Sequence, residues 1–290
     1  MISSVGPNLP LPLLEATGCY AGPLTINVDR AMPKADLLET KFALWTRSVL
    51  EDWADGAFDG YETVVFSRGD DNAQRLYYYI CELRRQKLIG GPEPVIFDVA
   101  MVRRATSLAH MEVALRSLAA RFGVQAEDLA AAMQKTQNHN ATSTEQGASV
   151  CLLIGTPPPD CRLHNAISKG GMQPEGPILP EIWAASPKYE GYSNGDPFAL
   201  LASSLHSSTL ISRSFSEPAV SLKSRLGKGA VKAAVLWCSE DDEAIVWHVP
   251  AMQQVLAEAG VPTLVLTRRD WAGQDGAVQE IEAFTRENAA

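Results

Sequence analysis

The chain has 290 residues, of which 46% are hydrophobic and 20% charged, and its formal net charge is −9. This length allows two domains of ordinary size, each with a hydrophobic core of its own. The negative charge argues against nucleic acid as the expected partner because a phosphate backbone would be repelled, and the lack of an apolar run of about 18 residues argues against a membrane span.

The start of the chain and the cysteines indicate a reducing compartment. The first residues have neither the basic segment nor the apolar segment of a secretory signal. Without such a signal, cysteines that form no CxxC pair are expected to be reduced thiols in the cytoplasm rather than a disulfide framework. The five cysteines are Cys19, Cys81, Cys151, Cys161 and Cys238.

The first half of the chain alternates predicted strands with predicted amphipathic helices. Short β-branched and aromatic runs indicate buried strands, and apolar residues at helical spacing indicate helices. The first of these helices begins with Asp70 or Asp71 as its N-cap, and the next ends at Gly123. The predicted elements are strands over 61–67 and 95–100 and helices over 70–87, 107–123 and 125–141.

The second half repeats this alternation after a polar segment at 142–149, which is the best candidate boundary. The predicted elements are strands over 150–155, 229–239 and 261–266 and helices over 162–171, 196–208, 249–260 and 275–288. The sequence therefore predicts two Rossmann-like or flavodoxin-like α/β lobes, 1–145 and 146–290, each a parallel sheet flanked by helices, with a cleft between them. Residues 178–196 have no assigned element.

Candidate ligand-binding residues lie in loops that follow predicted strands, because ligands of open α/β sheets bind beyond the carboxyl ends of the strands. Ser67 and Arg68 precede a helix whose first amides, together with the arginine, predict an anion site. A helix cap beside a surface arginine is the simpler alternative. Gly155 and Thr156 are candidates for a phosphate site, although no GxxxxGK[ST] or GxGxxG motif accompanies them. The candidate loops are 67–71, 98–101, 155–159 and 237–242.

The histidines and the surroundings of Cys238 give no sign of a metal site or a reactive thiol. No HExxH motif is present, and His110 and His139 are predicted to be ordinary helix residues. Cys238 ends a predicted strand, and acidic residues occupy 240–243. Because neighbouring negative charge raises the pKa of a thiol, we predict that Cys238 is a small residue at a strand end.

Five stretches of the sequence carry, in order, a resemblance to a known family. They are LPLPLLEATGCYAGPLTI, YETVVFSRGDDNAQRLYYYICEL, LRSLAARFGVQAEDLAAAMQKTQN, VCLLIGTPPPDCRLHNAISKGG, and AAVLWCSEDDEAIVWHVPAMQQVLAEAGVPTLVL with the terminal IEAF. In this order they resemble the 2-hydroxyacyl-CoA dehydratase and benzoyl-CoA reductase subunits, of the 2-hydroxyglutaryl-CoA dehydratase β-subunit type. The resemblance spans most of the chain.

The resemblance implies a pair of related subunits that act on a CoA thioester. In the redox members of the family, cysteines hold a [4Fe–4S] cluster between the two lobes, and an ATP-driven activator charges that cluster. The cluster then passes one electron to the thioester. Thiolates are the ligands that such clusters require.

This sequence departs from the family at the cluster positions. One family cysteine falls on Asp70, another near residues 39–40, and a third near residues 178–179, none of which is cysteine. Only Cys238 matches, at the end of its predicted strand. Because a cubane normally takes about four ligands, we expect no cofactor on this chain.

Three functional hypotheses follow. In the first, the chain is the cluster-free subunit of a heteromeric acyl-CoA dehydratase or reductase, and a related partner subunit holds the cluster. In the second, it is a stand-alone acyl-CoA lyase or hydratase that pairs with itself. There Asp70, Asp71 or Glu240 would be the general acid or base, and Arg68 would stabilise the thioester oxygen. In the third, it is a binding module for an acyl ligand.

Overall fold

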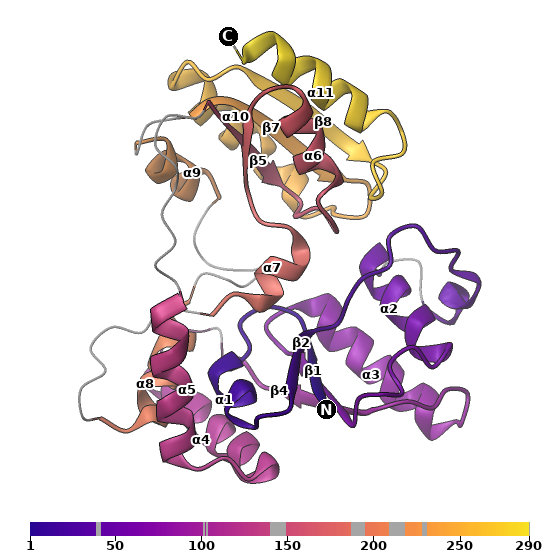
Figure 1. Cartoon of the computed structure of the whole chain (residues 1–290), viewed down its shortest axis with the longest axis vertical. Coiled ribbons are helices and arrows are strands. Elements are labelled where there is room, and N and C mark those ends of the chain that lie inside the picture. Colours follow the sequence, from indigo (N-terminus) through magenta and orange to yellow (C-terminus); the bar gives the residue numbers. More distant parts are fainter. Residues whose placement is uncertain are drawn as a thin grey trace.

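The structure is a computed structural model, and it describes residues 1–38, 42–100, 102, 104–139, 149–186, 195–208, 218–227 and 231–289. The described strands form two four-stranded sheets, each in a lobe of its own. Figure 1 shows the lobe with the first sheet below and the lobe with the second sheet above.

The first sheet has the strand order β2-β1-β3-β4, and neighbouring strands are parallel. Strands β1 and β3 are buried along their whole length, as expected when helices cover both faces of a parallel sheet. The elements of this lobe are β1 (Ile2–Val5), α1 (Leu11–Ala16), β2 (Tyr20–Pro23), the 3₁₀ helix η1 (Pro33–Leu37), α2 (Leu44–Ala54), β3 (Thr63–Ser67), α3 (Asp71–Arg85), β4 (Glu93–Phe97), α4 (Ala105–Phe122) and α5 (Ala126–His139).

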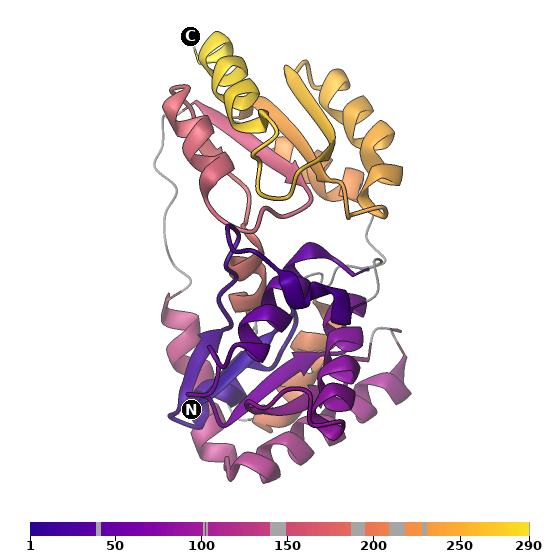
Figure 2. The same cartoon turned by 90° about the vertical axis from the view of Figure 1, so that its right-hand side faces the viewer.

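The second sheet has the equivalent order β6-β5-β7-β8, again with parallel neighbours. Figure 2 shows α6 and α11 on one side of this sheet and α10 on the other. The elements of the second half are β5 (Val150–Gly155), α6 (Arg162–Lys169), β6 (Gln173–Glu175), α7 (Leu179–Ala184), α8 (Pro197–Ser207), α9 (Pro218–Leu226), β7 (Val231–Ser239), η2 (Ile245–His248), α10 (Val249–Glu258), β8 (Thr263–Arg269) and α11 (Ala277–Asn288).

Alternate residues of the central strands point to opposite faces of each sheet and enter separate cores. In β3, Val65 packs with residues of α1, α4 and α5, whereas Val64 and Phe66 pack with residues of α2 and α3. Strand β7 divides in the same way, so that Trp237 faces α6 and α11 and Cys238 faces α10. The position of Cys238 in this alternation decides what its thiol can contact.

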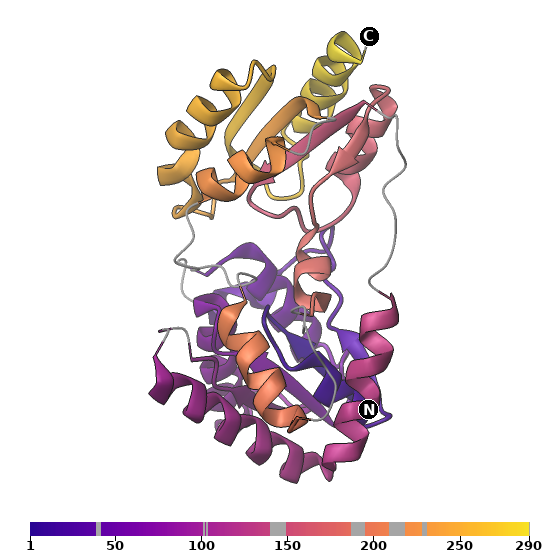
Figure 3. The same cartoon turned by 90° about the vertical axis from the view of Figure 1, so that its left-hand side faces the viewer.

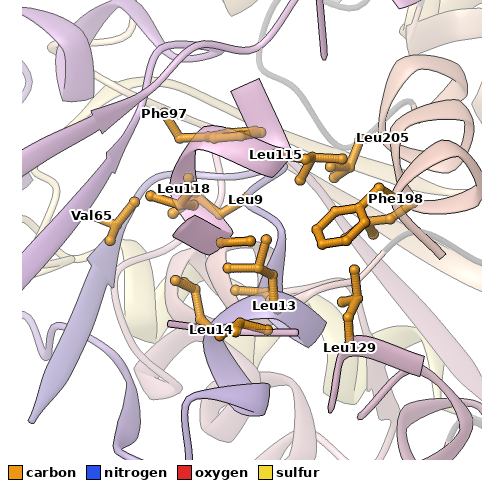
Figure 4. Close-up of a cluster of buried hydrophobic side chains, with 14 of the residues drawn as sticks. Leu9, Leu13, Leu14, Val65, Phe97, Leu115, Leu118, Leu129, Phe198 and Leu205 are labelled. Atoms are coloured by element: carbon orange, nitrogen blue, oxygen red, sulfur yellow. The ribbon is translucent and has the colours of Figure 1, made fainter. Parts of the chain in front are cut away.

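Two helices from the second half of the chain complete the core of the first lobe. Phe198 and Leu205 of α8 pack in the same cluster as Leu115 of α4 and Leu129 of α5 (Figure 4), and Figure 3 shows α8 beside the helices of the first lobe. Trp183 of α7 lies in the core beneath α2 and α3. Burial of these large apolar side chains stabilises the packing of α7 and α8 against the first lobe by about 1.5–3 kcal/mol for each residue. The predicted lobe 146–290 thus contains a segment that packs with the other lobe.

The predicted fold class is confirmed, because both sheets are parallel and flanked by helices. Most of the predicted boundary at 142–149 lies outside the described residues. Within 178–196, the structure shows α7, while 187–194 lie outside the described residues. None of the helices formed by described residues is both long enough and apolar enough to cross a membrane.

Candidate functional site

Each sheet has a topological switch point, where connections leave a strand toward opposite sides of the sheet. In the first sheet the chain goes from β1 to β2 on one side and continues to β3 and β4 on the other, so the switch point lies between β1 and β3. The same argument places the second switch point between β5 and β7. Ligands of open α/β sheets bind outside the carboxyl ends of strands at such points.

The carboxyl edges of the two sheets face each other. Asp29 follows β2, and its carboxylate accepts hydrogen bonds from Arg162 (3.1 and 3.0 Å) and Gln274 (3.2 Å), which follow β5 and β8. The Arg162 guanidinium lowers the pKa of Asp29. Val28 packs beside Trp271 at the same place. We call the region between the loops that follow β1, β3, β5 and β7 the lobe junction.

Asp241 links the lobes at this junction by capping a helix of the other lobe. The residue in the N-cap position of α2 is Ala43, which has no side chain that can accept a hydrogen bond. The carboxylate of Asp241 takes this role, since its Oδ2 accepts the backbone N–H of Leu44 at 2.8 Å, and its Oδ1 accepts the hydroxyl of Ser239. Asn72 accepts the N–H of Ala43 at 3.3 Å from the first turn of α3. The start of α2 therefore lies between the two switch points.

The predicted residues of the first lobe lie together at the carboxyl end of β3. Ser67 is fully buried, and its hydroxyl accepts the N–H of Gly69 at 3.1 Å. Asp70 is the N-cap of α3 and accepts the N–H of Ala73 at 2.8 Å, so one of its contacts is structural. Asp71 is exposed in the first turn of α3. The alternative of a helix cap beside an exposed arginine therefore describes much of this loop.

The predicted residues of the second lobe lie together at the second switch point. Gly155 has φ +109°, and a Cβ there would lie 2.1 Å from the carbonyl oxygen of Trp237, so only glycine fits this approach of β5 to β7. The hydroxyl of Thr156 donates to Asp242 (2.9 Å) and accepts the N–H of Ser239 (3.2 Å). Glu240 is exposed beside these residues.

Cys238 is unsuited to hold iron. Its side chain is fully buried on the α10 face of β7, and burial, with a smaller contribution from Asp242, raises its pKa to about 11. Of the other family positions, Asp70 caps α3, 178–179 begin α7, and 39–40 lie outside the described residues. The described residues at these positions supply no thiolate, so they do not fit a conventional cubane.

Asp98 joins two residues that the sequence analysis treated separately. The Nη1 atom of Arg68 and the Nε2 atom of His110 each lie 2.9 Å from Oδ2 of Asp98, and the His110 side chain is 54% exposed. When neutral, His110 donates from Nε2 to this carboxylate, so its Nδ1 can accept a proton. The loop at 98–101 is one of the candidate loops, but no signal in the sequence pairs it with His110.

Asn8 is a buried polar residue that the sequence analysis missed. It follows β1 at the first switch point with φ +57°, and its side chain is 1% exposed. Its Nδ2 donates to the carbonyl of Leu205 in α8 at 3.1 Å, whereas its Oδ1 has no hydrogen-bond partner among the described residues. Two residues earlier, a Cβ on Gly6 would lie 2.9 Å from the Cβ of Ser67. The end of β1 is therefore pressed closely against the candidate loop that follows β3.

Comparison of the chain with models of known protein families finds no match, and comparison with curated proteins finds no significant match.

Proposed function

We propose that this chain is the non-redox subunit of a heteromeric complex related to 2-hydroxyacyl-CoA dehydratase and benzoyl-CoA reductase, which acts on an acyl-CoA thioester. The observation that carries the proposal is the state of Cys238. It is the one cysteine at a family ligand position, yet it is buried in a sheet core with a pKa of about 11. The carboxyl edges of the two sheets face each other. This arrangement suits an acyl-CoA site that is formed by the two lobes and needs no cluster on this chain.

In this proposal the partner subunit holds a [4Fe–4S] cluster, which supplies one-electron chemistry when it is bound. The described residues of this chain bind and orient the thioester at the lobe junction. Arg68 is 46% exposed there, and its positive charge favours an electron-rich thioester oxygen. Thr156 and Asp242 fix the loop on the opposite side through their hydrogen bond of 2.9 Å.

Anaerobic co-expression with a related, cysteine-bearing subunit tests this proposal. We expect the two chains to purify together, with iron and acid-labile sulfide that depend on the partner. The control is Cys238→Ala in this chain, which should leave the iron content and the complex unchanged. Recovery of about four irons on this chain alone would refute the proposal, and so would loss of iron in the Cys238→Ala complex.

A second candidate function is favoured by the contacts of Asp98. In a stand-alone hydratase, Nδ1 of His110 would take a proton from water while the water oxygen bonds to Cβ of an enoyl thioester. The π electrons of the double bond would move to Cα and the thioester carbonyl, and the imidazolium would return the proton to Cα. Asp98 would position the ring through its contact with Nε2.

An activity assay of the purified chain without a partner subunit distinguishes the two functions, because only the hydratase would turn over its substrate alone. The purified chain is given crotonyl-CoA, and the loss of enoyl absorbance is followed. A hydratase should lose about 100-fold or more of kcat in His110→Asn, and it should lose kcat with little change of KM in Asp98→Asn. Glu287→Gln, which changes an exposed acid of the second lobe that is not a candidate for the site, is the matched control. An inactive chain, or a fully active His110→Asn variant, would exclude the hydratase.

A further inference from the structure

We propose that the first lobe has a second ligand site, at the C-terminal end of α3, for a phosphate-bearing small molecule of the nucleotide class. A pocket of about 680 Å³ lies there, formed by the ends of α2 and α3 and by the loop that leads to β4. The pocket is an open depression of the surface, so a ligand there would stay partly in contact with solvent. Because α3 has 15 residues, the pocket is about 20 Å along the helix from the lobe junction.

The charge of this pocket is opposite to that of the whole chain. Among the described residues that line it are the three cations Arg84, Arg85 and Lys87, and no acid, whereas the chain has a net charge of −9. Arg85 is paired with Glu82 through contacts of 2.7 and 2.6 Å. Arg84 and Lys87 have no acidic partner among the described residues. The positive charge of Arg84 and Lys87 favours an anion at this place, and the negative end of the α3 dipole opposes part of that attraction.

The backbone at Lys87 is held in a conformation that glycine usually adopts. Lys87 has φ +62° immediately after the last turn of α3, where its N–H donates to Arg84 and the next N–H donates to Leu83. At the corresponding positions after α4 and α10, the chain has Gly123 (φ +71°) and Gly260 (φ +67°). A lysine at such a position costs stability relative to glycine. A charged side chain thus stands where the φ angle alone favours glycine, and its charge also stabilises the negative end of the α3 dipole.

The pocket also has an apolar wall on a fixed loop. Leu88 is 59% exposed and lines the pocket beside the two unpaired cations. The loop that follows is anchored because Trp53, which is buried, donates from its Nε1 to the carbonyl of Gly90 at 2.9 Å. A ligand with a phosphate group for Arg84 and Lys87 and an apolar sugar or base face for Leu88 fits these surroundings. Nucleotides have this combination, and CoA contains one.

Equilibrium titration of the full chain with inorganic phosphate, ADP, CoA and dephospho-CoA tests the inference. We expect millimolar binding of phosphate, tighter binding of the organic phosphates, and weakening by salt. Arg84→Gln should weaken each by about tenfold, because one charge-assisted contact is lost. The matched control is Arg286→Ala, which removes an exposed arginine from α11 in the other lobe and should leave binding unchanged. A difference between CoA and dephospho-CoA shows which phosphate is bound.

Lys87→Gly separates the ligand role from a structural role. It should raise the melting temperature, because glycine adopts positive φ without strain, and it should weaken phosphate binding. If wild type binds none of the four compounds, or if Arg84→Gln and Lys87→Gly bind them as wild type does, the inference is wrong. The inference does not rest on the proposed function: CoA binding that is insensitive to both variants would overturn this site and leave the lobe junction as the CoA site.

Discussion

Asp241 of the second lobe caps α2 of the first lobe, because its carboxylate accepts the first backbone N–H of that helix. The substitution Asp241→Ala removes this carboxylate. In the native chain, Oδ2 of Asp241 accepts the N–H of Leu44 at 2.8 Å, and the neighbouring N-cap residue, Ala43, offers no substitute. Loss of an N-cap acceptor costs about 0.5–2 kcal/mol, and loss of a negative charge at a helix N-terminus costs about 0.3–1 kcal/mol. Because part of the dipole effect is contained in the capping value, we expect a total loss of about 1–2 kcal/mol.

Equilibrium urea unfolding measures this loss. Tryptophan fluorescence and circular dichroism should be followed together, because the two lobes can unfold in separate transitions. Asp241→Asn keeps an acceptor and loses the charge, so it should lose about half as much. Glu240→Ala removes an exposed acid from the same acidic run, and its change should stay within about 0.5 kcal/mol. Equal stability of Asp241→Ala and Glu240→Ala would show that the cross-lobe cap does not stabilise the fold.

Four further predictions follow from the same regions. The Cβ of Gly155→Ala would lie 2.1 Å from a carbonyl oxygen of β7, so this change should lower the free energy of unfolding by more than about 3 kcal/mol. Gly18 has φ +69° and no neighbour within 4 Å, so Gly18→Ala should lower it by about 1 kcal/mol. Equal losses of stability in thermal denaturation would contradict the close approach of β5 to β7. The pKa of the Cys238 thiol is about 11 in the folded chain and about 8.5 in the unfolded chain. The thiol therefore stabilises the fold fully below about pH 8.5, and this contribution is lost as the pH rises toward 11. In Cys238→Ala, the free energy of unfolding should therefore fall less steeply over this pH range. In native protein at pH 8, Cys238 should react with iodoacetamide at least about 100-fold more slowly than the exposed Cys19, and comparable rates would disprove its burial. Asp70→Ala should cost about 1 kcal/mol and Asp70→Ser should restore most of it, unless the carboxylate has a role other than capping α3.

The longer elements could be predicted from the sequence because their signals are local. The β-branched run in β3 and the apolar runs in β5 and β7 indicate buried strands, and the helix that follows β3 has both an apolar stripe and an N-cap in Asp70. Strand β1, which has the sequence ISSV, has no such signal. Its two serines are fully buried, and they are satisfied by the carbonyl of Gly22 and the hydroxyl of Tyr20 on β2. Only the neighbouring strands make it the centre of the first sheet.

The candidate site shows the same division. The sequence by itself determined which loops follow strands, so Ser67, Arg68, Gly155 and Thr156 could be assigned to the carboxyl edges of parallel sheets. Which polar groups meet there was decided by the tertiary structure. Asp241 caps a helix 197 residues away in the chain, and Asp98 pairs with Arg68 and His110 from two other elements.

The physical reason is the range of the interactions concerned. Helix stripes, caps and strand runs depend on neighbours within a few turns or residues, so they can be read from a short window of sequence. A hydrogen bond between distant segments depends on how the sheets stack and on which partner each buried polar group finds once water is excluded. The sequence therefore determined two parallel α/β lobes and their candidate loops, and only the folded chain decided that Cys238 is buried and that α8 completes the first core.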